Sequence, residues 1–430
     1  MTTGHDTKTG GRATLGEIAR VLQSAPKQTF FICLGAYILS QLDVALFAYA
    51  IPSIRKELDI SLSVMGLVTG LSHILAAAIL IGFARLTDRF GRKRMLAIGT
   101  AAAPIVISLT ALCWSAWSLG IMRGLGFAAT GISYPATGAL VTETAPARVR
   151  GIFAGLLQTG YPIGWFAAAM LAAPLLTHFN WRFLFLITLL WVPYTWVIVR
   201  FLKEPARFEA AQKSGATGVT FGQALRELLA PGNRRRLAIL FLAQFMFVVA
   251  YGGTQVFFPT YFVEERHLQI SSSAYLVGIG NAVAVLGYIL AAVTGEAFLT
   301  RRTTVVIWTL LGSAMLMVLI WGTTTYTETI VAFAVMSMFF TGTAAVKFAY
   351  IAEVFPTHLR ATGLTVCGVL AVSLGQSLGP ILMAEGVKHL GWNMALSLVG
   401  AIPLMVAGLF YLFLKPIPSG LEVEEAARQA

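Results

Sequence analysis

The sequence predicts an all-α membrane protein whose twelve transmembrane helices form two pseudo-symmetric six-helix bundles. Three observations predict this fold class: the hydrophobicity of the whole chain, twelve apolar runs of similar length, and an internal repeat. Of the 430 residues, 57% are hydrophobic and only 12% are charged, which is too apolar for a water-soluble domain of this length. Most of the chain is therefore expected to lie in lipid.

A transmembrane helix needs about 20 consecutive apolar residues, and the chain contains twelve runs of roughly that length. The six runs of the first half are 29–52, 63–83, 95–113, 117–141, 151–176 and 182–201. The six runs of the second half are 237–262, 273–295, 303–322, 329–352, 363–384 and 391–414. Each run is predicted to form one helix that crosses the membrane.

The segment between the two sets of runs is polar. Residues 203–236 contain two prolines, several glycines and the basic run Arg234-Arg235-Arg236. This composition predicts a solvated linker with one short amphipathic helix around Phe221 to Leu229. The expected organisation is a tail, a six-helix bundle, the linker, a second six-helix bundle and a second tail. The boundaries of these five parts are 1–28, 29–202, 203–236, 237–414 and 415–430.

The net charge of +12 is carried mainly by the tails, the linker and short loops. If the N-terminus lies in the cytoplasm, most of the 31 Lys and Arg fall on the cytoplasmic side, as the positive-inside rule requires. We therefore expect a multi-pass protein of the plasma membrane, the inner membrane in a bacterium, with both termini in the cytoplasm. The same charge distribution excludes nucleic acid as a partner.

An internal repeat relates the two halves of the chain. The motif E-x-x-P-x-x-x-R from Glu143 to Arg150 recurs from Glu353 to Arg360, so that each of its residues returns 210 positions later. Parallel repeats of six spans predict two bundles with a substrate site near the midplane between them. One bundle is then expected to rock against the other.

The loop after the second run, Ala84-Arg85-Leu86-Thr87-Asp88-Arg89-Phe90-Gly91-Arg92-Lys93, resembles the G-x-x-x-D-R-x-G-R-R signature of the major facilitator superfamily. The paired E-x-x-P-x-x-x-R motifs resemble those of its sugar-porter and metabolite:proton-symporter branches. The resemblance implies the major facilitator fold, transport by alternating access, and a cytoplasmic gate whose charges form ion pairs in one state. The gate residues would be Asp88, Arg89, Gly91, Arg92, Glu143, Arg150, Glu353 and Arg360.

Within the superfamily, the chain is most similar to proton symporters of aromatic and other carboxylic acids. The similar segments are Leu42-Asp43-Val44 in the first run, Arg123 and Pro135 in the fourth, and Gly160-Tyr161-Pro162 in the fifth. The resemblance implies secondary active import of a small organic anion, an aromatic or aliphatic carboxylate, together with protons. A proton-coupled transporter of a sugar, polyol or other neutral metabolite is the alternative within transport. A transporter-like nutrient sensor is the alternative from another class.

An enzyme is not expected. The sequence has no H-E-x-x-H, G-x-S-x-G or P-loop motif, its six histidines are scattered, and its three cysteines lie in apolar segments without metal-ligand spacing. We therefore predict no catalytic residue, metal or cofactor. The expected partners are the small-molecule substrate, protons and the lipid bilayer, with the protein acting as a monomer.

Charged side chains at membrane depth are costly, so each one is a candidate functional residue. Asp43 lies about nine residues from the outer end of the first run, and Arg123 about six residues from the outer end of the fourth, so the two are expected close enough to meet. An acid that loses an Arg partner in a low-dielectric cavity binds a proton, so the pair is predicted to couple protons to transport. The alternative is a permanent ion pair between helices.

Lys347 in the tenth run has two interpretations. Its long side chain could extend to the nearby cytoplasmic surface, or its ammonium could bind a substrate carboxylate in the cavity. Uncharged polar residues with helical spacing are predicted to line the same cavity, and interhelical hydrogen bonds are the alternative for each. His73 is expected to be a packing residue rather than a proton relay. The predicted substrate-binding residues are Tyr37, Gln41, Gln158, Tyr161, Gln244, Tyr251, Gln255, Asn281, Lys347 and Gln376.

Overall fold

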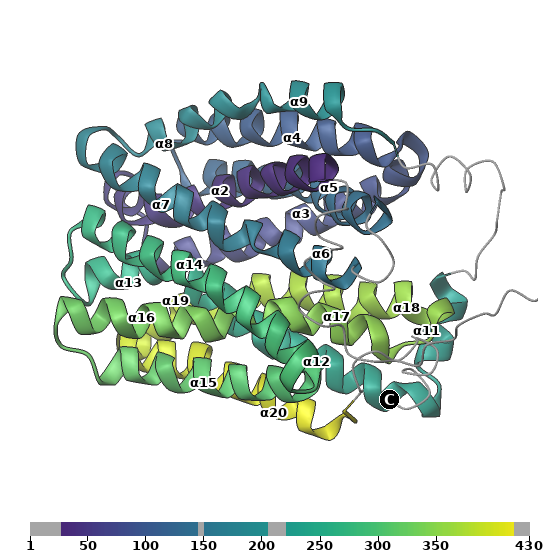
Figure 1. Cartoon of the computed structure of the whole chain (residues 1–430). Helices are drawn as coiled ribbons and strands as arrows, with labels where there is room; N and C mark the ends of the chain where they lie inside the picture. The colour runs from purple at the N-terminus through teal and green to yellow at the C-terminus, as the bar shows by residue number, and fades with distance from the viewer. Residues whose placement is uncertain (1–26, 145–149, 205–220, 417–430) are drawn as a thin grey trace, which may run out of the picture.

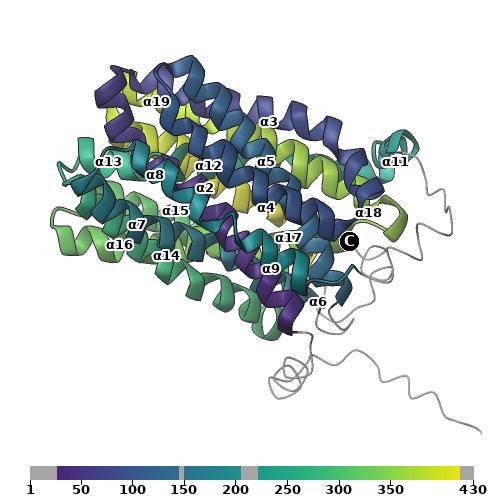
Figure 2. The same cartoon turned by 90° about the horizontal axis from the view of Figure 1, so that it is seen from above.

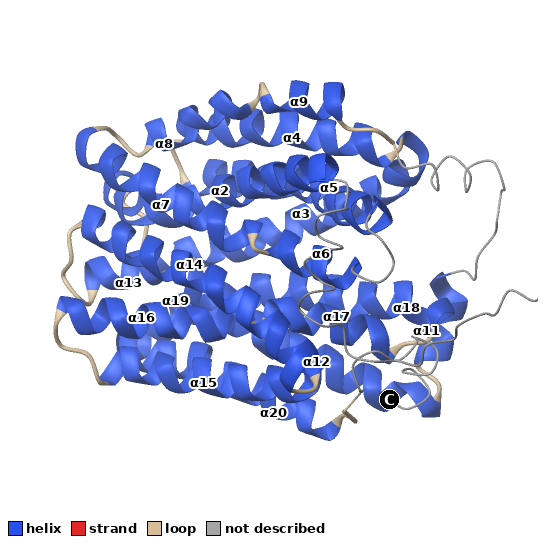
Figure 3. Ribbon diagram, in the orientation of Figure 1, coloured by secondary structure: helices blue, strands red, loops and turns tan. Residues whose placement is uncertain are grey.

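The computed structural model of the chain describes residues 27–144, 150–204 and 221–416, and all regular structure in these residues is helical (Figure 3). The helices of the N-terminal half are α2 (Lys27–Leu58), α3 (Leu62–Phe90), α4 (Arg92–Ser108), α5 (Ala116–Thr144), α6 (Arg150–Gln158), α7 (Gly160–His178), α8 (Arg182–Leu186) and α9 (Tyr194–Phe201). The linker helix is α11 (Phe221–Leu228), where the sequence predicts a short amphipathic helix.

The helices of the C-terminal half are α12 (Pro231–Gln255), α13 (Phe258–Glu264), α14 (Ile270–Val293), α15 (Arg301–Trp321), α16 (Tyr326–Gly342), α17 (Ala344–Val354), α18 (Thr357–Leu364), α19 (Ala371–Ala395) and α20 (Ile402–Phe410). Short 3₁₀ or π-helical segments continue several of them. These are η1 (Leu109–Leu112), η3 (Ile187–Trp191), η4 (Thr294–Phe298), η5 (Thr365–Leu370), η6 (Leu396–Ala401) and η7 (Tyr411–Phe413).

Ten helical segments of the described residues are long and apolar enough to cross a membrane. The last of them, Thr362–Phe413, is 52 residues long. It bends at Gly391, whose φ of 78° lies outside the helical region, and so contains two helices. The 29-residue α5 packs beside α3 and α4 in the same bundle. This arrangement is consistent with the predicted twelve spans.

In the described residues, several spans are divided into shorter helices by one or two residues in a turn. These breaks lie at Thr159 between α6 and α7, at Val192 and Pro193 before α9, at Val256 and Phe257 between α12 and α13, and at Thr343 between α16 and α17. Thr159 and Thr343 keep dihedral angles of the helical region, so the chain runs on in nearly the same direction there. The breaks at Thr159, at Val256 and Phe257, and at Thr343 lie within a few residues of predicted site residues.

The two halves lie side by side with their helices roughly parallel (Figures 1 and 2). The main contacts between the halves are α3 against α19 and α7 against α14, and α2 contacts α13 at one end. We call the end that carries α8 and α13 the distal end, and the end that carries α11 the linker end (Figure 1). Small residues permit the close approach. A Cβ atom added to Gly66 of α3 would lie only 2.8 Å from the carbonyl oxygen of Pro380 in α19.

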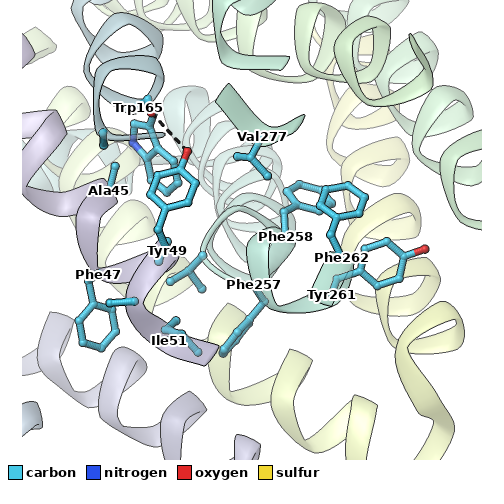
Figure 4. Packing of buried hydrophobic residues seen from close by; sticks show 14 of the residues in the cluster. Ala45, Phe47, Tyr49, Ile51, Trp165, Phe257, Phe258, Tyr261, Phe262 and Val277 are labelled. Carbon is cyan, nitrogen blue, oxygen red and sulfur yellow. Dashed lines mark hydrogen bonds between the residues drawn. The ribbon is translucent and has the colours of Figure 1, made fainter. Parts of the chain in front are cut away.

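One hydrophobic core joins the two halves towards the distal end. It includes Phe47 and Tyr49 of α2, Trp165 of α7 and Phe258 of α13 (Figure 4). The hydroxyl of Tyr49 donates a hydrogen bond to the carbonyl oxygen of Trp165 at 3.2 Å. Large apolar side chains on the outside of the bundle, such as Trp117 with 81% of its surface exposed, are those of a protein whose solvent is lipid.

Candidate functional site

Asp43 is buried inside the N-terminal half. Only 2% of its surface is exposed, and its Oδ1 accepts a hydrogen bond of 2.8 Å from the indole N–H of Trp191 in η3. A small cavity beside the carboxylate is lined by the hydroxyl-bearing side chains of Ser40, Thr100 and Ser133, among others. The rest of the lining is mainly apolar, so the indole N–H is the described hydrogen-bond donor to the carboxylate, and no described cation pairs with it.

Arg123 does not form the predicted pair with Asp43. Its guanidinium lies between the rings of Phe47 and Phe127, at 3.9 and 4.3 Å from their centroids, and its Nη1 donates to the carbonyl oxygen of Val44 at 3.3 Å. Two cation–π contacts and a backbone acceptor thus take the place of the acid. The sequence-based prediction used only the depth of the two residues along their helices. Successive residues of α2 point about 100° apart around the helix axis, so two residues at similar depth can point in different directions.

His73 lies on the other side of this stack. Its ring is 4.1 Å from that of Phe127 between centroids, and its Nδ1 is 2.9 Å from the carbonyl oxygen of Thr69 in the preceding turn. These contacts are those of a packing residue that shares an aromatic neighbour with Arg123.

Lys347 lies near the start of α17 with 2% of its surface exposed. Its Nζ is 2.8 Å from the ring centroid of Phe247 in α12, so the side chain does not extend to the surface. No carboxylate pairs with it among the side chains that the structure describes. The amino group is therefore placed inside the protein, and its described contact is the face of the Phe247 ring.

Aromatic rings lead from Phe247 across to the other half. Tyr251 stacks beside Phe247 at 6.1 Å, and Tyr161 of α7 lies 5.7 Å from Tyr251. Trp165 follows at 5.6 Å from Tyr161. Because Tyr251 belongs to the C-terminal half and Tyr161 to the N-terminal half, this series of rings crosses the boundary between the bundles.

A second group of tyrosines lies beside the first. The ring of Tyr37 is 5.6 Å from that of Tyr134 in α5, whose hydroxyl accepts a 3.2 Å hydrogen bond from Nε2 of Gln158. Tyr288 of α14 lies in the neighbourhood of both tyrosines. Although Tyr134 lies well inside α5, 45% of its surface is exposed.

The other predicted polar residues differ in whether their hydrogen-bonding groups are occupied. Gln244 and Gln255 are buried, and Oε1 of Gln244 and Nε2 of Gln255 have no described partner. Asn281 donates to the carbonyl oxygen of Val277 in its own helix at 2.9 Å. Gln376 packs over Gly252, where an added Cβ would lie 2.7 Å from its Oε1. The two glutamines thus retain unused hydrogen-bonding capacity.

Gln41 of α2 packs against α7 within the N-terminal half. A Cβ added to Gly164 of α7 would lie 2.7 Å from the Cβ of Gln41. The glycine therefore allows α7 to approach α2 closely at the level of the predicted site.

Most of the predicted gate lies outside the described residues. This holds for the side chains of Asp88, Arg89, Glu143, Arg150, Glu353 and Arg360. Gly91 has a φ of 90°, which favours glycine. The carboxylate of Glu204 accepts hydrogen bonds from the backbone N–H groups of Arg92 at 2.7 Å and Lys93 at 3.0 Å. It thereby caps the N-terminus of α4, where a negative charge is favourable.

The distal end carries an ion pair that the sequence pattern does not reveal. Arg55, at the end of α2, pairs with Glu264, at the end of α13. The Nε of Arg55 also donates to the carbonyl oxygen of Ile60 at 3.2 Å. A second ion pair at the same end, between Arg182 and Glu57, stays within the N-terminal half. Only the first of these two connects the halves.

Two further aromatic residues of the site were open to prediction. Tyr134 precedes Thr137, the repeat counterpart of Lys347, by three residues. Tyr288 follows Asn281 by seven residues and so shares its helix face. A search for polar residues at these helical spacings from the predicted site residues would identify both tyrosines. The partner of Asp43, Trp191, has no such signal because its span is continuously apolar.

Paired six-helix bundles with polar and charged groups buried at their boundary define a membrane transporter. Residues 33–298 match the Major Facilitator Superfamily. The chain belongs to this superfamily, and it is a multi-pass membrane transporter rather than an enzyme.

Relatives and solved structures agree with this assignment. The chain is 26% identical over 391 residues to the cis,cis-muconate transport protein of Acinetobacter baylyi, covering 88% of this chain and 94% of that protein. It is 27% identical over 394 residues to the 3-(3-hydroxy-phenyl)propionate transporter of Escherichia coli, covering 89% and 92%. Its fold is similar to the crystal structure of a D-xylose–proton symporter, with a TM-score of 0.71, 16% identity, and coverage of 91% and 98%.

Proposed function

We propose that the protein imports a small organic acid, an aromatic or unsaturated carboxylate, together with protons by alternating access. The observation that carries this proposal is the buried Lys347, which has no described acidic partner and lies at one end of a series of aromatic rings between the halves. The names of the relatives, transporters of muconate and of a hydroxyphenylpropionate, support the same class of substrate.

Substrate recognition uses residues from both halves in this proposal. The ammonium of Lys347 pairs with the carboxylate. The rings of Phe247, Tyr251 and Tyr161 pack against the flat part of the substrate, and the unpaired amide of Gln244 hydrogen-bonds to a polar substituent. Tyr37, Gln158, Gln255 and Gln376 complete the lining. Asn281 and Gln41 lie beside this lining.

Proton coupling is assigned to Asp43, with Trp191 as its hydrogen-bond donor. A carboxylate buried next to a small cavity can exist in ionised and protonated forms, and a change in the position of Trp191 would shift the balance between them. Arg123 contributes a positive charge nearby without direct pairing, because its guanidinium donates to the carbonyl oxygen of Val44, the residue after Asp43. The linker end faces the cytoplasm, as the positive-inside rule predicts, and the predicted gate motifs lie there. The protein acts as a monomer of the plasma membrane, with both termini in the cytoplasm.

Uptake into liposomes tests the proposal. Purified protein should accumulate labelled cis,cis-muconate or 3-(3-hydroxyphenyl)propionate when the distal side is made acidic, and accumulation should disappear with a protonophore. A thermal-shift screen of aromatic acids, short aliphatic acids, sialic acid and sugars identifies the best ligand without a prior guess. Uptake that ignores the pH gradient would exclude proton symport. Stabilisation by sugars alone would favour the neutral-metabolite alternative.

The Asp43→Asn variant separates coupling from transport. It should abolish uphill accumulation while preserving exchange of labelled for unlabelled substrate, because exchange does not require net proton movement. The matched control is Asp59→Asn at the exposed distal end of the same span, where the backbone φ of 49° suits Asn as well as Asp. Persistent accumulation by Asp43→Asn would move the proton site elsewhere.

A further inference from the structure

We propose that Lys347 takes up a proton when the substrate carboxylate binds, so that substrate and one proton enter the C-terminal half as a single event. This inference rests on the proposed function and deepens it. It makes Lys347 a second proton site besides Asp43, which lies in the other half of the protein.

The surroundings of Lys347 favour this behaviour. The side chain is buried, and its Nζ faces the ring of Phe247 at 2.8 Å from the centroid. Taking an isolated ammonium out of water costs more than one aromatic face returns. The charged form therefore lacks compensation in the empty site. A carboxylate placed beside Nζ supplies the missing opposite charge.

The elements packed against α17 provide no described acid nearby. These elements are α6, α14, α15, α16 and α18. Their described titratable or charged side chains are Tyr275 and Tyr288 of α14, Arg301 and Arg302 of α15, and Tyr326 and Glu328 of α16. Through Phe247, α12 adds Tyr251. The side chains of Arg150, Glu353, His358 and Arg360 lie outside the described residues.

Glu328 is the one described acid in this set, and it does not reach Lys347. It lies in the first turn of α16, at the distal end of a span that continues through Thr343 to Lys347. Its carboxylate accepts hydrogen bonds from the backbone N–H groups of Thr324 at 2.8 Å and Thr325 at 3.1 Å. Glu328 therefore serves as a helix cap.

The chemistry balances without any further reactant. The neutral amine of Lys347, one proton from the distal side and the substrate carboxylate combine into an ammonium–carboxylate ion pair. No covalent bond of the substrate changes. Release at the linker end returns both the proton and the carboxylate. A monoanion that travels with this proton crosses the membrane without net charge, and a proton on Asp43 adds one positive charge.

The number of protons taken up per ligand bound tests the inference. Calorimetric titrations of the purified full-length protein are run at the same pH in two buffers that differ in ionisation enthalpy. The probes are cis,cis-muconate, 3-(3-hydroxyphenyl)propionate and gentisate. We expect the wild type to take up about one proton per carboxylate at alkaline pH, with affinity falling about tenfold per pH unit there. If none of the three probes binds, the proposed function itself fails.

Three variants assign the proton. Lys347→Arg carries a permanent charge and should bind the probe without proton uptake and without the tenfold slope. Lys347→Gln should weaken binding at least tenfold and remove its pH dependence, which keeps the test available if the arginine variant does not fold. Asp43→Asn should retain proton uptake on binding. Uptake by Lys347→Arg equal to that of the wild type, or loss of uptake only in Asp43→Asn, would overturn the inference while leaving carboxylate transport intact.

Discussion

Breaking the ion pair between Arg55 and Glu264 should increase opening at the distal end. This ion pair joins the two halves at that end, and its two side chains are 20% and 35% exposed. Pairs with this exposure contribute about 0.5–1 kcal/mol after solvent screening. Without this stabilisation of the distally closed state, the ratio of open to closed molecules rises about two- to fivefold, which is the ratio that corresponds to about 0.5–1 kcal/mol.

The assay measures access to the seam that the pair closes. Ala384 is fully buried and lies opposite Gly66, so a cysteine at this position reacts with an impermeant maleimide only when the distal end opens. The three native cysteines are buried and unpaired, and they are replaced by serine or alanine if they react. In this background, Arg55→Gln should raise the labelling rate two- to fivefold.

A control variant and a refuting outcome are available at the same end. Arg182→Gln breaks a pair of similar exposure that joins residues of one half only, so it should leave the labelling rate unchanged. Exchange of the two charges in Arg55→Glu with Glu264→Arg should restore the wild-type rate. Equal rates for wild type and Arg55→Gln, or an equal increase in Arg182→Gln, would refute a role of the pair in closing the distal end.

Three further predictions concern residues with defined contacts. Gly66→Val should prevent full distal closure, because even a Cβ would lie 2.8 Å from the carbonyl oxygen of Pro380; cysteine labelling should rise, and an unchanged rate would contradict the close contact. Glu204→Ala should lower the stability by about 1 kcal/mol through loss of the cap on α4, seen as a lower thermal unfolding midpoint than in the wild type and in Lys56→Ala, which changes an exposed side chain. Trp191→Phe removes the hydrogen bond to Asp43. Because a hydrogen bond to a charged group contributes about 1.5–3 kcal/mol, the pH of half-maximal uptake should move upward by about one to two units; an unchanged pH profile would show that the indole does not influence coupling.

The fold was predictable because lipid acts as a uniform solvent. Every span must present apolar side chains and satisfy its own backbone, so length and hydrophobicity locate the helices. The interruptions at Thr159 and Thr343 were not predictable from hydrophobicity, because both lie within continuous apolar runs.

The site was predictable in composition but less so in contacts. Asp43, Arg123 and Lys347 stand out because charge is rare in apolar runs. Their partners do not, because Trp191, Phe47 and Phe247 are apolar or aromatic residues of the kind that every span contains. Depth along a helix follows from counting residues, whereas the direction of a side chain around the axis depends on how the helices pack.

In the proposed site, the contact between Tyr161 and Tyr251 would limit the thickness of the cargo. One ring belongs to each half, so any movement of the bundles changes the gap between them. A flat molecule that enters this gap is compatible with both positions of the bundles. A rigid acid of greater thickness would hold the rings apart and stall the cycle, so bulky aromatic acids should act as competitive inhibitors that bind without being carried.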